Sequence, residues 1–412
     1  MSRHWTSAQG SLWGLSALAF TGGLGGGVVF PILPVVGLAL GITPAMIGLI
    51  LALNRITRLA INPITGHLVD RFGARWPLLT GLCVEGLATL CFAAGLRSGH
   101  ATAWFLLGRV LWGVGSSLLM VGSLTAALIV SEAARRGNAA ATVRMWLSFG
   151  VPAGMVLGGL VADLLSARAA FLSAAAITFG GMIAAYFIAP RRTAAPPIDG
   201  ARHKPAARGM MRELLRCGSL WIVCTFNFIV FFSVQGVILA ALVLILRERH
   251  LTLASLGPEG SAGVLMAAMI GSSALVSLGV GRWIDRHGRK ADPLLPASLC
   301  CVAGFALLAA SARMSAAVLA LGAIGIGLGG INIPLVVILG DLVSADRYGR
   351  AIGMYQVLGD IGGSLGPIIG LEAIGRFGPA RPLAAVAAAS LVTVPLSLAL
   401  RHRERAARSS MA

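Results

Sequence analysis

Two acidic residues stand inside long apolar runs of the sequence, where a carboxyl group can carry a proton. Glu85 and Asp360 are the only acids well inside such runs. Apolar surroundings favour the neutral form of a carboxyl, which a proton carrier must be able to reach. We therefore take both residues as candidates for coupling to protons. The alternative is that each acid pairs with a nearby arginine, Glu85 for example with Arg55 or Arg58.

One arginine and three amides also lie inside apolar runs. Arg109 is costly there unless it faces a polar cavity or a partner, so its presence calls for a function or a paired structural role. The amides are Asn227, Gln235 and Asn332. Each amide is a candidate to line a cavity, and the plainer alternative is that it bridges two helices.

Two short charged turns repeat one pattern between apolar runs. Both carry a glycine, then Asp-Arg, then a second glycine followed by basic residues. The first comprises Gly66, Asp70, Arg71, Gly73 and Arg75, and the second Gly281, Asp285, Arg286, Gly288, Arg289 and Lys290. The pattern indicates one helical hairpin used twice, with glycine permitting the turn and arginines at the membrane surface. The alternative is a duplicated basic turn without a further role.

The composition indicates an all-α membrane protein. Of the 412 residues, 57% are hydrophobic and only 12% are charged, about half the charge of an average soluble domain. The net charge of +18 comes largely from arginines in turns on the side of both termini, which the positive-inside rule explains better than nucleic-acid binding does. The six cysteines lack metal-ligand spacing, and the glycine run Gly22–Gly27 is not followed by Lys-Ser/Thr. We therefore expect no metal, cofactor, nucleotide or nucleic acid.

The elements that must position these residues are twelve transmembrane helices in two six-helix, pseudo-symmetric bundles. Apolar runs of about the 20 residues needed to cross a membrane recur along the chain. The spans are predicted at 12–40, 46–66, 77–96, 102–130, 139–164, 168–189, 218–246, 261–281, 293–312, 315–343, 349–372 and 381–401. The domains follow as a bundle at 1–189, a cytoplasmic linker at 190–217, a bundle at 218–401 and a cytoplasmic tail at 402–412. Both termini are predicted to be cytoplasmic, in a plasma (inner) membrane.

The charged turns resemble those of the major facilitator superfamily, and within it the twelve-span drug and metabolite exporters usually coupled to protons. The second turn matches the family pattern throughout, whereas the first has Ala74 at a usually basic position. The resemblance implies that acids at the ends of the fourth and tenth spans, here Glu132 and Asp341, join these turns in a charged latch. The alternative is that both acids are merely solvated.

Two further motifs carry the resemblance. Arg109 precedes Gly113 and Gly115 as in the fourth span of the family. Glycine ladders of the fifth and eleventh spans are matched by Gly150, Gly154, Gly158 and Gly159, with Met155 at the usual proline position, and by Gly362, Gly366, Pro367 and Gly370. Because this spacing puts glycines on one helix face, close packing alone is the alternative explanation.

The resemblance implies a secondary transporter, not an enzyme, that works by alternating access without ATP. The first, fourth, seventh and tenth spans would line its path, which makes Arg109, Asn227, Gln235 and Asn332 the cavity candidates. We expect a small-molecule substrate, protons and the lipid bilayer as partners of a monomer. Export of a drug or metabolite is favoured by the fifth-span glycines. Uptake of a metabolite on the same fold, or a membrane enzyme or receptor, remain the alternatives.

Overall fold

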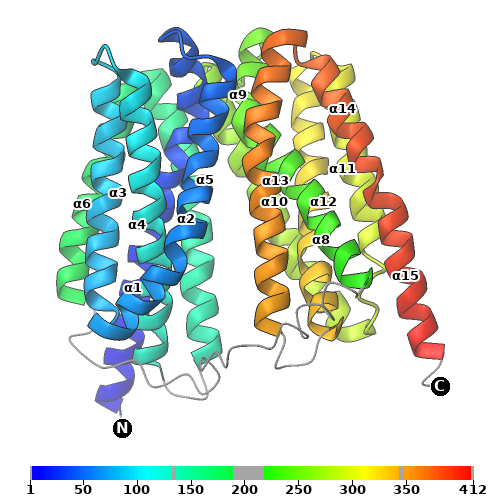
Figure 1. The fold of residues 1–412 in the computed structure, drawn as a ribbon, viewed down its shortest axis with the longest axis horizontal. Coiled ribbons are helices and arrows are strands. Elements are labelled where there is room, and N and C mark those ends of the chain that lie inside the picture. The colour runs from blue at the N-terminus through cyan, green and yellow to red at the C-terminus, as the bar shows by residue number, and fades with distance from the viewer. Residues whose placement is uncertain (1, 132–135, 189–217, 343–347, 410–412) are drawn as a thin grey trace. The chain divides into compact units, whose positions relative to one another are not determined.

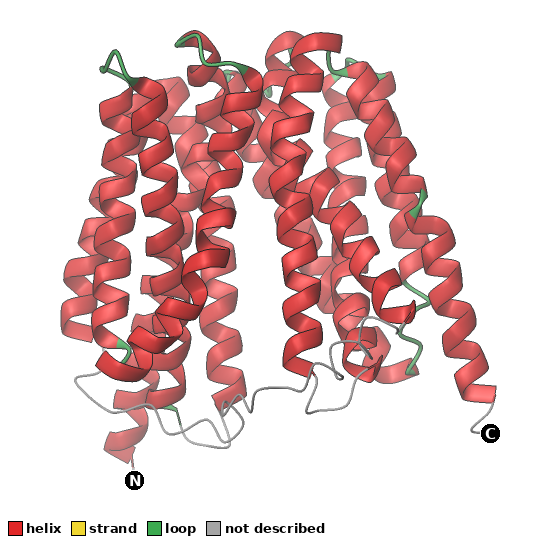
Figure 2. Ribbon diagram, viewed as in Figure 1, coloured by secondary structure: helices red, strands yellow, loops and turns green. Residues whose placement is uncertain are grey.

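The protein is helical throughout the part of the chain that the structure describes. This computed structural model describes residues 2–131, 136–188, 218–342 and 348–409, and no strand occurs among them (Figure 2). Eleven of the described helices are long and apolar enough to cross a membrane, and a shorter apolar helix, Leu294–Ala310, has 17 residues. The all-α membrane fold is confirmed, and the ninth predicted span is the short helix.

The first compact unit, unit 1, contains six helices that run alongside one another (Figure 1). They are α1 (Ser2–Ala39), α2 (Pro44–Phe72), α3 (Arg75–Gly95), α4 (Ala101–Val130), α5 (Arg136–Leu164) and α6 (Ala167–Ile188). Residues Ala254–Val264 also belong to unit 1. Asp163 of α5 holds this segment, because its Oδ2 accepts a hydrogen bond of 2.8 Å from the N–H of Gly260.

Glycines set the packing of unit 1, where α1 lies against α5. A Cβ at Gly150 would lie 2.8 Å from the Leu24 nitrogen, and one at Gly158 would lie 2.8 Å from the Val28 Cα. The approach is reciprocal, since a Cβ at Gly27 of α1 would lie 2.8 Å from the Met155 nitrogen. The backbones of α1 and α5 therefore touch along several turns, as small residues at fourfold spacing allow.

The second compact unit, unit 2, contains the remaining described helices. They are α8 (Gly218–Val230), η2 (Phe231–Ile238), α9 (Leu239–Glu248), α10 (Pro258–His287, from Leu265 on), α11 (Leu294–Ala310), α12 (Met314–Leu342), α13 (Tyr348–Phe377), α14 (Ala380–Leu391) and α15 (Thr393–Ser409). The segments α8, η2 and α9 follow one another without a break, and η2 is a π-helix. Together they form the seventh span, and α14 with α15 forms the last.

The helix packing of unit 2 repeats that of unit 1. Helices α3 and α4 pack together as α11 and α12 do, and α3 packs on α6 as α11 packs on α14. The α1–α5 contact corresponds to the contact of α8 and η2 with α13. A duplicated six-helix bundle is therefore visible in the contacts within each unit.

Several helix ends differ from the sequence prediction. The second and eighth spans were predicted to end at Gly66 and Gly281, but α2 continues to Phe72 and α10 to His287. Both glycines thus lie inside helices, and no Cβ at Gly66 would meet another atom within 4 Å. Helix α15 runs through the predicted boundary at 401 to Ser409. The predicted linker, 190–217, lies outside the described residues.

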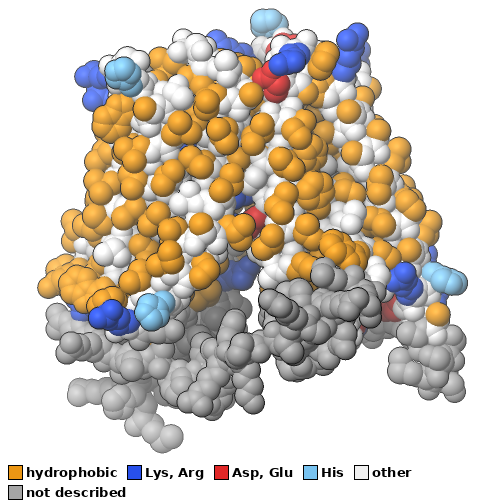
Figure 3. All heavy atoms as spheres, in the orientation of Figure 1, with side chains coloured by type: hydrophobic (Ala, Val, Ile, Leu, Met, Phe, Trp, Pro, Cys, Tyr) orange, Lys and Arg blue, Asp and Glu red, His pale blue; other side chains and the backbone are white. Residues whose placement is uncertain are grey.

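Hydrophobic side chains cover the flanks of both units in the face shown in Figure 3, and Lys, Arg and His side chains gather toward the helix ends. This is the distribution expected of surfaces that face lipid. Among the exposed large hydrophobic residues are Trp76, Leu165, Phe187, Leu275 and Leu319.

Candidate functional site

A cavity of about 230 Å³ lies inside unit 1, between α1, α2, α3, α4 and α5. Helix α1 contributes glycines and one aromatic ring, and α2, α3 and α4 contribute polar side chains. The residues that define it here are Gly22, Gly26, Phe30, Asn54, Arg58, Glu85, Trp112, Ser116, Met120 and Ser148. The cavity therefore combines one acid, one base, an amide, two hydroxyls and an indole in a mainly apolar wall.

Glu85 is the acid of this cavity, and its side chain is 1% exposed. Its Oε2 has no hydrogen-bond partner among the described residues. Two glycines make room for it: a Cβ at Gly22 would lie 3.0 Å from Oε2, and one at Gly115 would lie 2.7 Å from the Glu85 Cγ. A buried carboxylate is costly when it is charged and lacks partners, and one oxygen of Glu85 lacks a partner among the described residues.

The base and the amide of the cavity come from α2. Asn54 and Arg58 are four residues apart and so lie on one face of the helix. Among the described residues, Oε2 of Glu85 accepts no hydrogen bond from Arg55 or Arg58.

Trp112 fills the side of the cavity next to α1. A Cβ at Gly26 would lie 3.0 Å from its Cζ2, and one at Gly25 would lie 2.7 Å from its Cη2. The glycine run of α1 thus leaves space for the indole as well as for the backbone of α5. A flat indole and the Phe30 ring are suited to contact an aromatic or cationic compound.

Arg109 lies beside the cavity and does not line it. The side chain is 1% exposed, and it donates hydrogen bonds to backbone carbonyls of α2, from Nε to Ile50 O at 3.1 Å and from Nη2 to Leu51 O at 2.8 Å. Its guanidinium carbon lies 5.9 Å from the centre of the Phe30 ring. Nη1 has no hydrogen-bond partner among the described residues. Arg109 therefore ties α4 to α2 and keeps one donor available.

The two glycines that follow Arg109 each contact a different neighbouring helix, which explains why they are two residues apart. A Cβ at Gly113 would lie 2.8 Å from Asn54 O of α2, and one at Gly115 would lie 2.8 Å from Gly81 O of α3. Helix α4 therefore meets α2 through one glycine and α3 through the other. This double contact brings Arg109 to α2 and Glu85 to the cavity.

The three amide candidates lie on helices of unit 2. Asn227 of α8 is 1% exposed and donates from Nδ2 to Tyr355 O of α13 at 2.8 Å, so it bridges two helices. Gln235 is half-buried on η2, and Asn332 is half-buried on α12. Asp360 is buried on α13, where it is 7% exposed.

The first charged turn is held by aromatic contacts and one hydrogen bond. Gly73 adopts a φ of 74° where α2 ends, a conformation that favours glycine. Arg75 donates from Nη2 to Tyr186 O at 2.7 Å and lies 4.9 Å from the centre of the Tyr186 ring. Arg71 lies 5.3 Å from the ring centre of Phe72. The side chain of Asp70 and all of Glu132 lie outside the described residues.

The described side chains of the second charged turn form a network of ion pairs and hydrogen bonds. Gly288 takes the turn position, with a φ of 64°. The Lys290 ammonium pairs with Asp341 of α12, and Asp292 pairs with Arg401 of α15 at 2.6 Å. The two carboxylate oxygens of Glu404 accept hydrogen bonds from the Lys290 and Ala291 N–H groups, at 2.9 and 2.8 Å.

Other members of the second turn are exposed. Asp285 and Arg286 end α10 with exposed side chains, and Arg289 lies 4.0 Å from Asp292. The partner of Asp341 in this arrangement thus belongs to the same unit.

The glycine ladders act as packing surfaces within each unit. Gly150, Gly154 and Gly158 face α1, whereas a Cβ at Gly159 would approach Gly260 to 3.0 Å. In unit 2, a Cβ at Gly366 would lie 2.6 Å from the Gly236 Cα of η2, and Gly362 and Gly370 face Phe228 and Val237. Pro367 joins this contact, since its Cδ lies 3.2 Å from the Cβ position of Gly236.

Sequence reasoning missed the role of several cavity residues. Trp112 stood inside the Arg109 motif, but its contact with the α1 glycines depends on how two distant helices meet. Asn54 and Arg58 were recognisable as polar residues one helical turn apart in an apolar run. Their shared face was the signal available in the sequence.

A sequence model of the Major Facilitator Superfamily matches residues 15–367 and 253–410 of this chain. Among curated proteins, the chain is 30% identical over 148 residues to the synaptic vesicular amine transporter of Bos taurus, which covers 35% of this chain and 28% of that protein. It is 35% identical over 130 residues to the multidrug resistance protein Stp of Mycobacterium tuberculosis (strain ATCC 25618 / H37Rv), covering 31% and 24%.

The quinolone resistance protein NorA of Staphylococcus aureus (strain MRSA252) is 29% identical over 154 residues, covering 37% of this chain and 38% of that protein. The matched regions therefore span only 24 to 38% of the length of these relatives. The names are those of transporters and resistance proteins, not of enzymes.

Two solved structures share the fold over nearly the whole chain. The nucleoside transporter NupG aligns with a TM-score of 0.74 at 16% identity, covering 94% of this chain and 98% of that one. A bacterial homolog of the human lysosomal transporter Spinster, in an inward-facing and unoccupied conformation, aligns with a TM-score of 0.75 at 14% identity, covering 98% of both. At these identities the likeness shows the fold alone. With the family model matching most of its length, the chain belongs to the Major Facilitator Superfamily.

Proposed function

We propose that this protein is a proton-coupled secondary transporter that exports a small organic compound, with Glu85 as the coupling carboxyl. One observation carries the proposal: Glu85 is buried without a hydrogen-bond partner for Oε2, on the wall of a cavity large enough for part of a small molecule. Its polar neighbours there are Arg58 and Asn54.

The chemistry follows from competition for one carboxylate. In an apolar wall the charged carboxylate is disfavoured, so Glu85 holds a proton until another group stabilises its charge. A positively charged substrate group provides that stabilisation, and the proton then leaves as the substrate binds. Exchange of a proton for substrate at one carboxyl couples the two fluxes without ATP.

Alternating access supplies the movement. Each unit is a compact six-helix bundle, and rocking of two bundles around a central site is a mechanism in which binding energy selects one of two states. We propose that Arg109 keeps α2 and α4 together during this movement, and that Trp112 and Phe30 contact the organic part of the substrate. Asp360 is the second candidate for proton coupling, on the other unit.

The direction proposed is export. The multidrug and quinolone resistance proteins similar to this chain support it, together with the fifth-span glycines that pack α5 on α1. The competing proposal is uptake of a metabolite, for which the shared fold of a nucleoside transporter is the support. We place the protein in the plasma (inner) membrane as a monomer with cytoplasmic termini.

The test uses inverted membrane vesicles and whole cells. A panel of cationic, neutral and anionic compounds is added to energised inverted vesicles, and proton efflux is followed with a pH-sensitive dye. Export predicts that a subset of compounds dissipates the pH gradient in inverted vesicles and that cells expressing the protein accumulate less of them. The reverse pattern would replace export by uptake.

Glu85→Gln separates coupling from structure. At equal membrane abundance, the variant should lose pH-driven transport and bind a cationic substrate more weakly, because a glutamine can neither release a proton nor carry the charge that pairs with the substrate. Glu248→Gln is the matched control, since Glu248 is an exposed acid at the end of α9. Persistent pH-driven transport in Glu85→Gln would exclude Glu85 as the essential carrier.

A further inference from the structure

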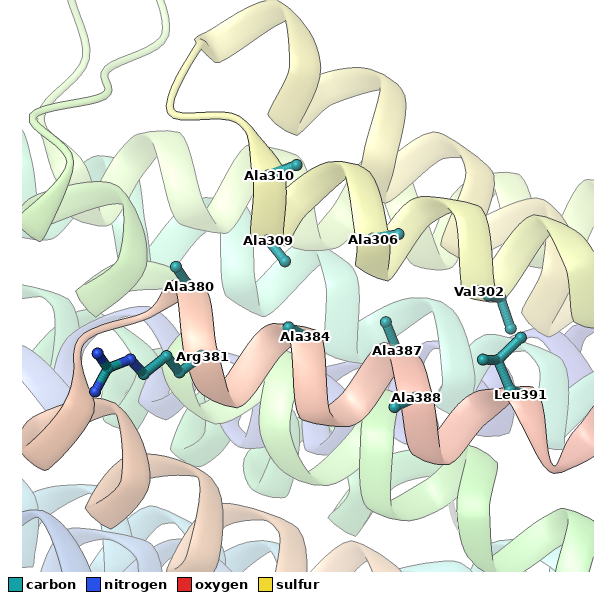
Figure 4. Close-up of a pocket in the computed structure, with 10 residues that line it drawn as sticks. All are labelled: Val302, Ala306, Ala309, Ala310, Ala380, Arg381, Ala384, Ala387, Ala388 and Leu391. Carbon is teal, nitrogen blue, oxygen red and sulfur yellow. The ribbon is translucent and has the colours of Figure 1, made fainter.

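A groove of about 600 Å³ opens on unit 2 between α11 and α14 (Figure 4). Its walls are almost entirely small and apolar, and one charged side chain lies at its end. Alanines from the two helices face each other across it, and the Arg381 side chain points outward from the start of α14, at the end marked by Ala380. The main wall residues are Val302, Ala306, Ala310, Ala384, Ala388 and Leu391.

The corresponding place in unit 1 is filled with aromatic rings. Helix α3 packs on α6 as α11 packs on α14. There, Phe92 of α3 and Phe171 of α6 are fully buried, with ring centres 5.4 Å apart. Phe171 is the fifth residue of α6, and the fifth residue of α14 is Ala384. The fold itself therefore does not require a groove, and unit 2 leaves open a space that unit 1 fills from within.

The groove is about as long, measured along α14, as one lipid leaflet is thick. From Ala380 to Leu391, α14 rises by about 16 Å, which is roughly half the thickness of the hydrocarbon core. It begins at a helix end, where lipid headgroups lie, and it ends where α14 gives way to α15 at Val392. An acyl chain that enters beside Arg381 would follow the groove to the middle of the bilayer.

The charge at the open end favours an anionic headgroup. The described residues of unit 2 at this end include the arginines Arg247, Arg249, Arg313, Arg376 and Arg381 and the acids Glu248 and Glu372. Glu372 forms an ion pair with Arg376, with 2.5 Å between Oε1 and Nε. Arg249 donates hydrogen bonds to backbone carbonyls at the end of α11, among them Leu308 O at 2.6 Å. Arg313 and Arg381 remain exposed with no ion pair among the described residues.

We propose that the groove between α11 and α14 binds one acyl chain of an anionic phospholipid, whose phosphate is held by Arg381. Basic side chains at a membrane surface attract anionic headgroups, and the alanine walls leave room for methylene groups that contact the protein by dispersion. A second copy of the chain is the rival occupant. A twofold interface here would bring the same arginines of both copies together, which like-charge repulsion disfavours.

The experiment measures lipid retention by the purified full-length protein. Delipidated protein is mixed with equal amounts of palmitoyl-oleoyl phosphatidylglycerol and palmitoyl-oleoyl phosphatidylcholine, and bound lipids are counted by native mass spectrometry. The wild-type protein should retain phosphatidylglycerol preferentially. Arg381→Gln should lower that preference about fivefold, the effect of one basic residue near the surface. Arg97→Gln, at an exposed loop of unit 1, should leave it unchanged.

Filling the groove tests the acyl-chain site separately. Ala384→Phe places in unit 2 the ring that unit 1 carries at Phe171, and it should remove the retained phosphatidylglycerol. Ala385→Phe, on an exposed face of α14 outside the groove, is the control. If Ala384→Phe lowers the melting temperature of the delipidated protein, Ala388→Leu serves in its place. Equal retention in the groove and control variants would overturn the proposal, as would a wild-type dimer that Ala384→Phe or Ala388→Leu converts to a monomer.

Discussion

Unit 1 and unit 2 repeat one helix arrangement but bury different charged side chains, since unit 1 buries an acid and an arginine whereas unit 2 buries the acid Asp360. Unit 1 buries Glu85 and Arg109 in mid-helix, each 1% exposed, and the described side chains of its charged turn make one hydrogen bond and aromatic contacts. Unit 2 has no arginine in α12 at the place of Arg109, and it concentrates ion pairs at the turn through Lys290, Asp292 and their partners.

The difference separates two tasks of a duplicated fold. A buried charge is costly, so it persists where it binds something or fixes a helix. Surface ion pairs contribute little stability each, but a network of them fixes a turn. On the proposed function, proton and substrate chemistry lies mainly in unit 1, and the charged turn with described ion pairs lies in unit 2.

The largest effect is expected from a change in the glycine contact of unit 1. Gly154→Leu places a side chain against the Leu24 backbone of α1, where a Cβ alone would lie 2.7 Å from the carbonyl carbon. Because backbone cannot move aside cheaply, we expect little folded protein in the membrane. Gly66→Leu is the control, since a Cβ there meets open space. Normal abundance and melting temperature of Gly154→Leu would contradict the packing described.

The next effect concerns Arg109. Lysine retains the charge but cannot donate from two nitrogens to Ile50 O and Leu51 O in the same fork. We expect Arg109→Lys to lose transport nearly as severely as Arg109→Ala, by at least about tenfold, since each hydrogen bond of a charged group contributes about 1.5–3 kcal/mol. Transport rates at matched membrane abundance measure this. If Arg109→Lys transported normally, the role of Arg109 would be only electrostatic. If Arg109→Ala were fully active, Arg109 would have no role in transport.

A smaller effect is expected at the second charged turn. Glu404→Ala removes both acceptors of the Lys290 and Ala291 N–H groups, so we expect a loss of about 0.5–2 kcal/mol of stability. Arg75→Ala in unit 1 removes one hydrogen bond to Tyr186 O and an exposed contact with the Tyr186 ring, and it should cost less. Unfolding midpoints in detergent compare the two. A larger loss in Arg75→Ala would reverse the contrast between the turns.

The smallest effect on stability is expected from Asp285→Asn. The side chain is exposed and forms no ion pair in the described residues, so the melting temperature should not change. The charged-latch hypothesis predicts slower transport, by up to about fivefold for the loss of one surface pair. Transport rates of Asp285→Asn, Asp70→Asn and the double variant provide the test. Normal rates in all three would remove the latch.

Much of the fold could be predicted because the length of the apolar runs reflects the thickness of the membrane, and the charged turns lie at its surfaces. The all-helical bundles follow from run length, and the turn glycines Gly73 and Gly288 from their place beside the arginines. The ends of α2 and α10 could not be predicted, because a helix extends beyond the hydrocarbon core as long as its backbone bonds are satisfied. Hydropathy shows which residues lie in the hydrocarbon core of the membrane, and it does not show where the helix ends.

The sequence pointed to the acid that lines the candidate site, but not to the shape of the cavity around it. Glu85 was found because a carboxyl inside an apolar run is rare. Trp112 was not, because a tryptophan in such a run is ordinary until its neighbours in space are known. Asn227 illustrates the opposite case, where a plausible cavity amide instead bonds to Tyr355 O of a neighbouring helix.

The most direct test of the central claim is the number of protons released when substrate binds. A compound that passes the vesicle screen is added to purified protein in weakly buffered detergent solution, and the pH change is recorded. If Glu85 exchanges a proton for substrate, wild-type protein should release about one proton per bound molecule near neutral pH, and Glu85→Gln none. Equal proton release by the wild-type protein and Glu85→Gln, at equal substrate occupancy, would contradict the account.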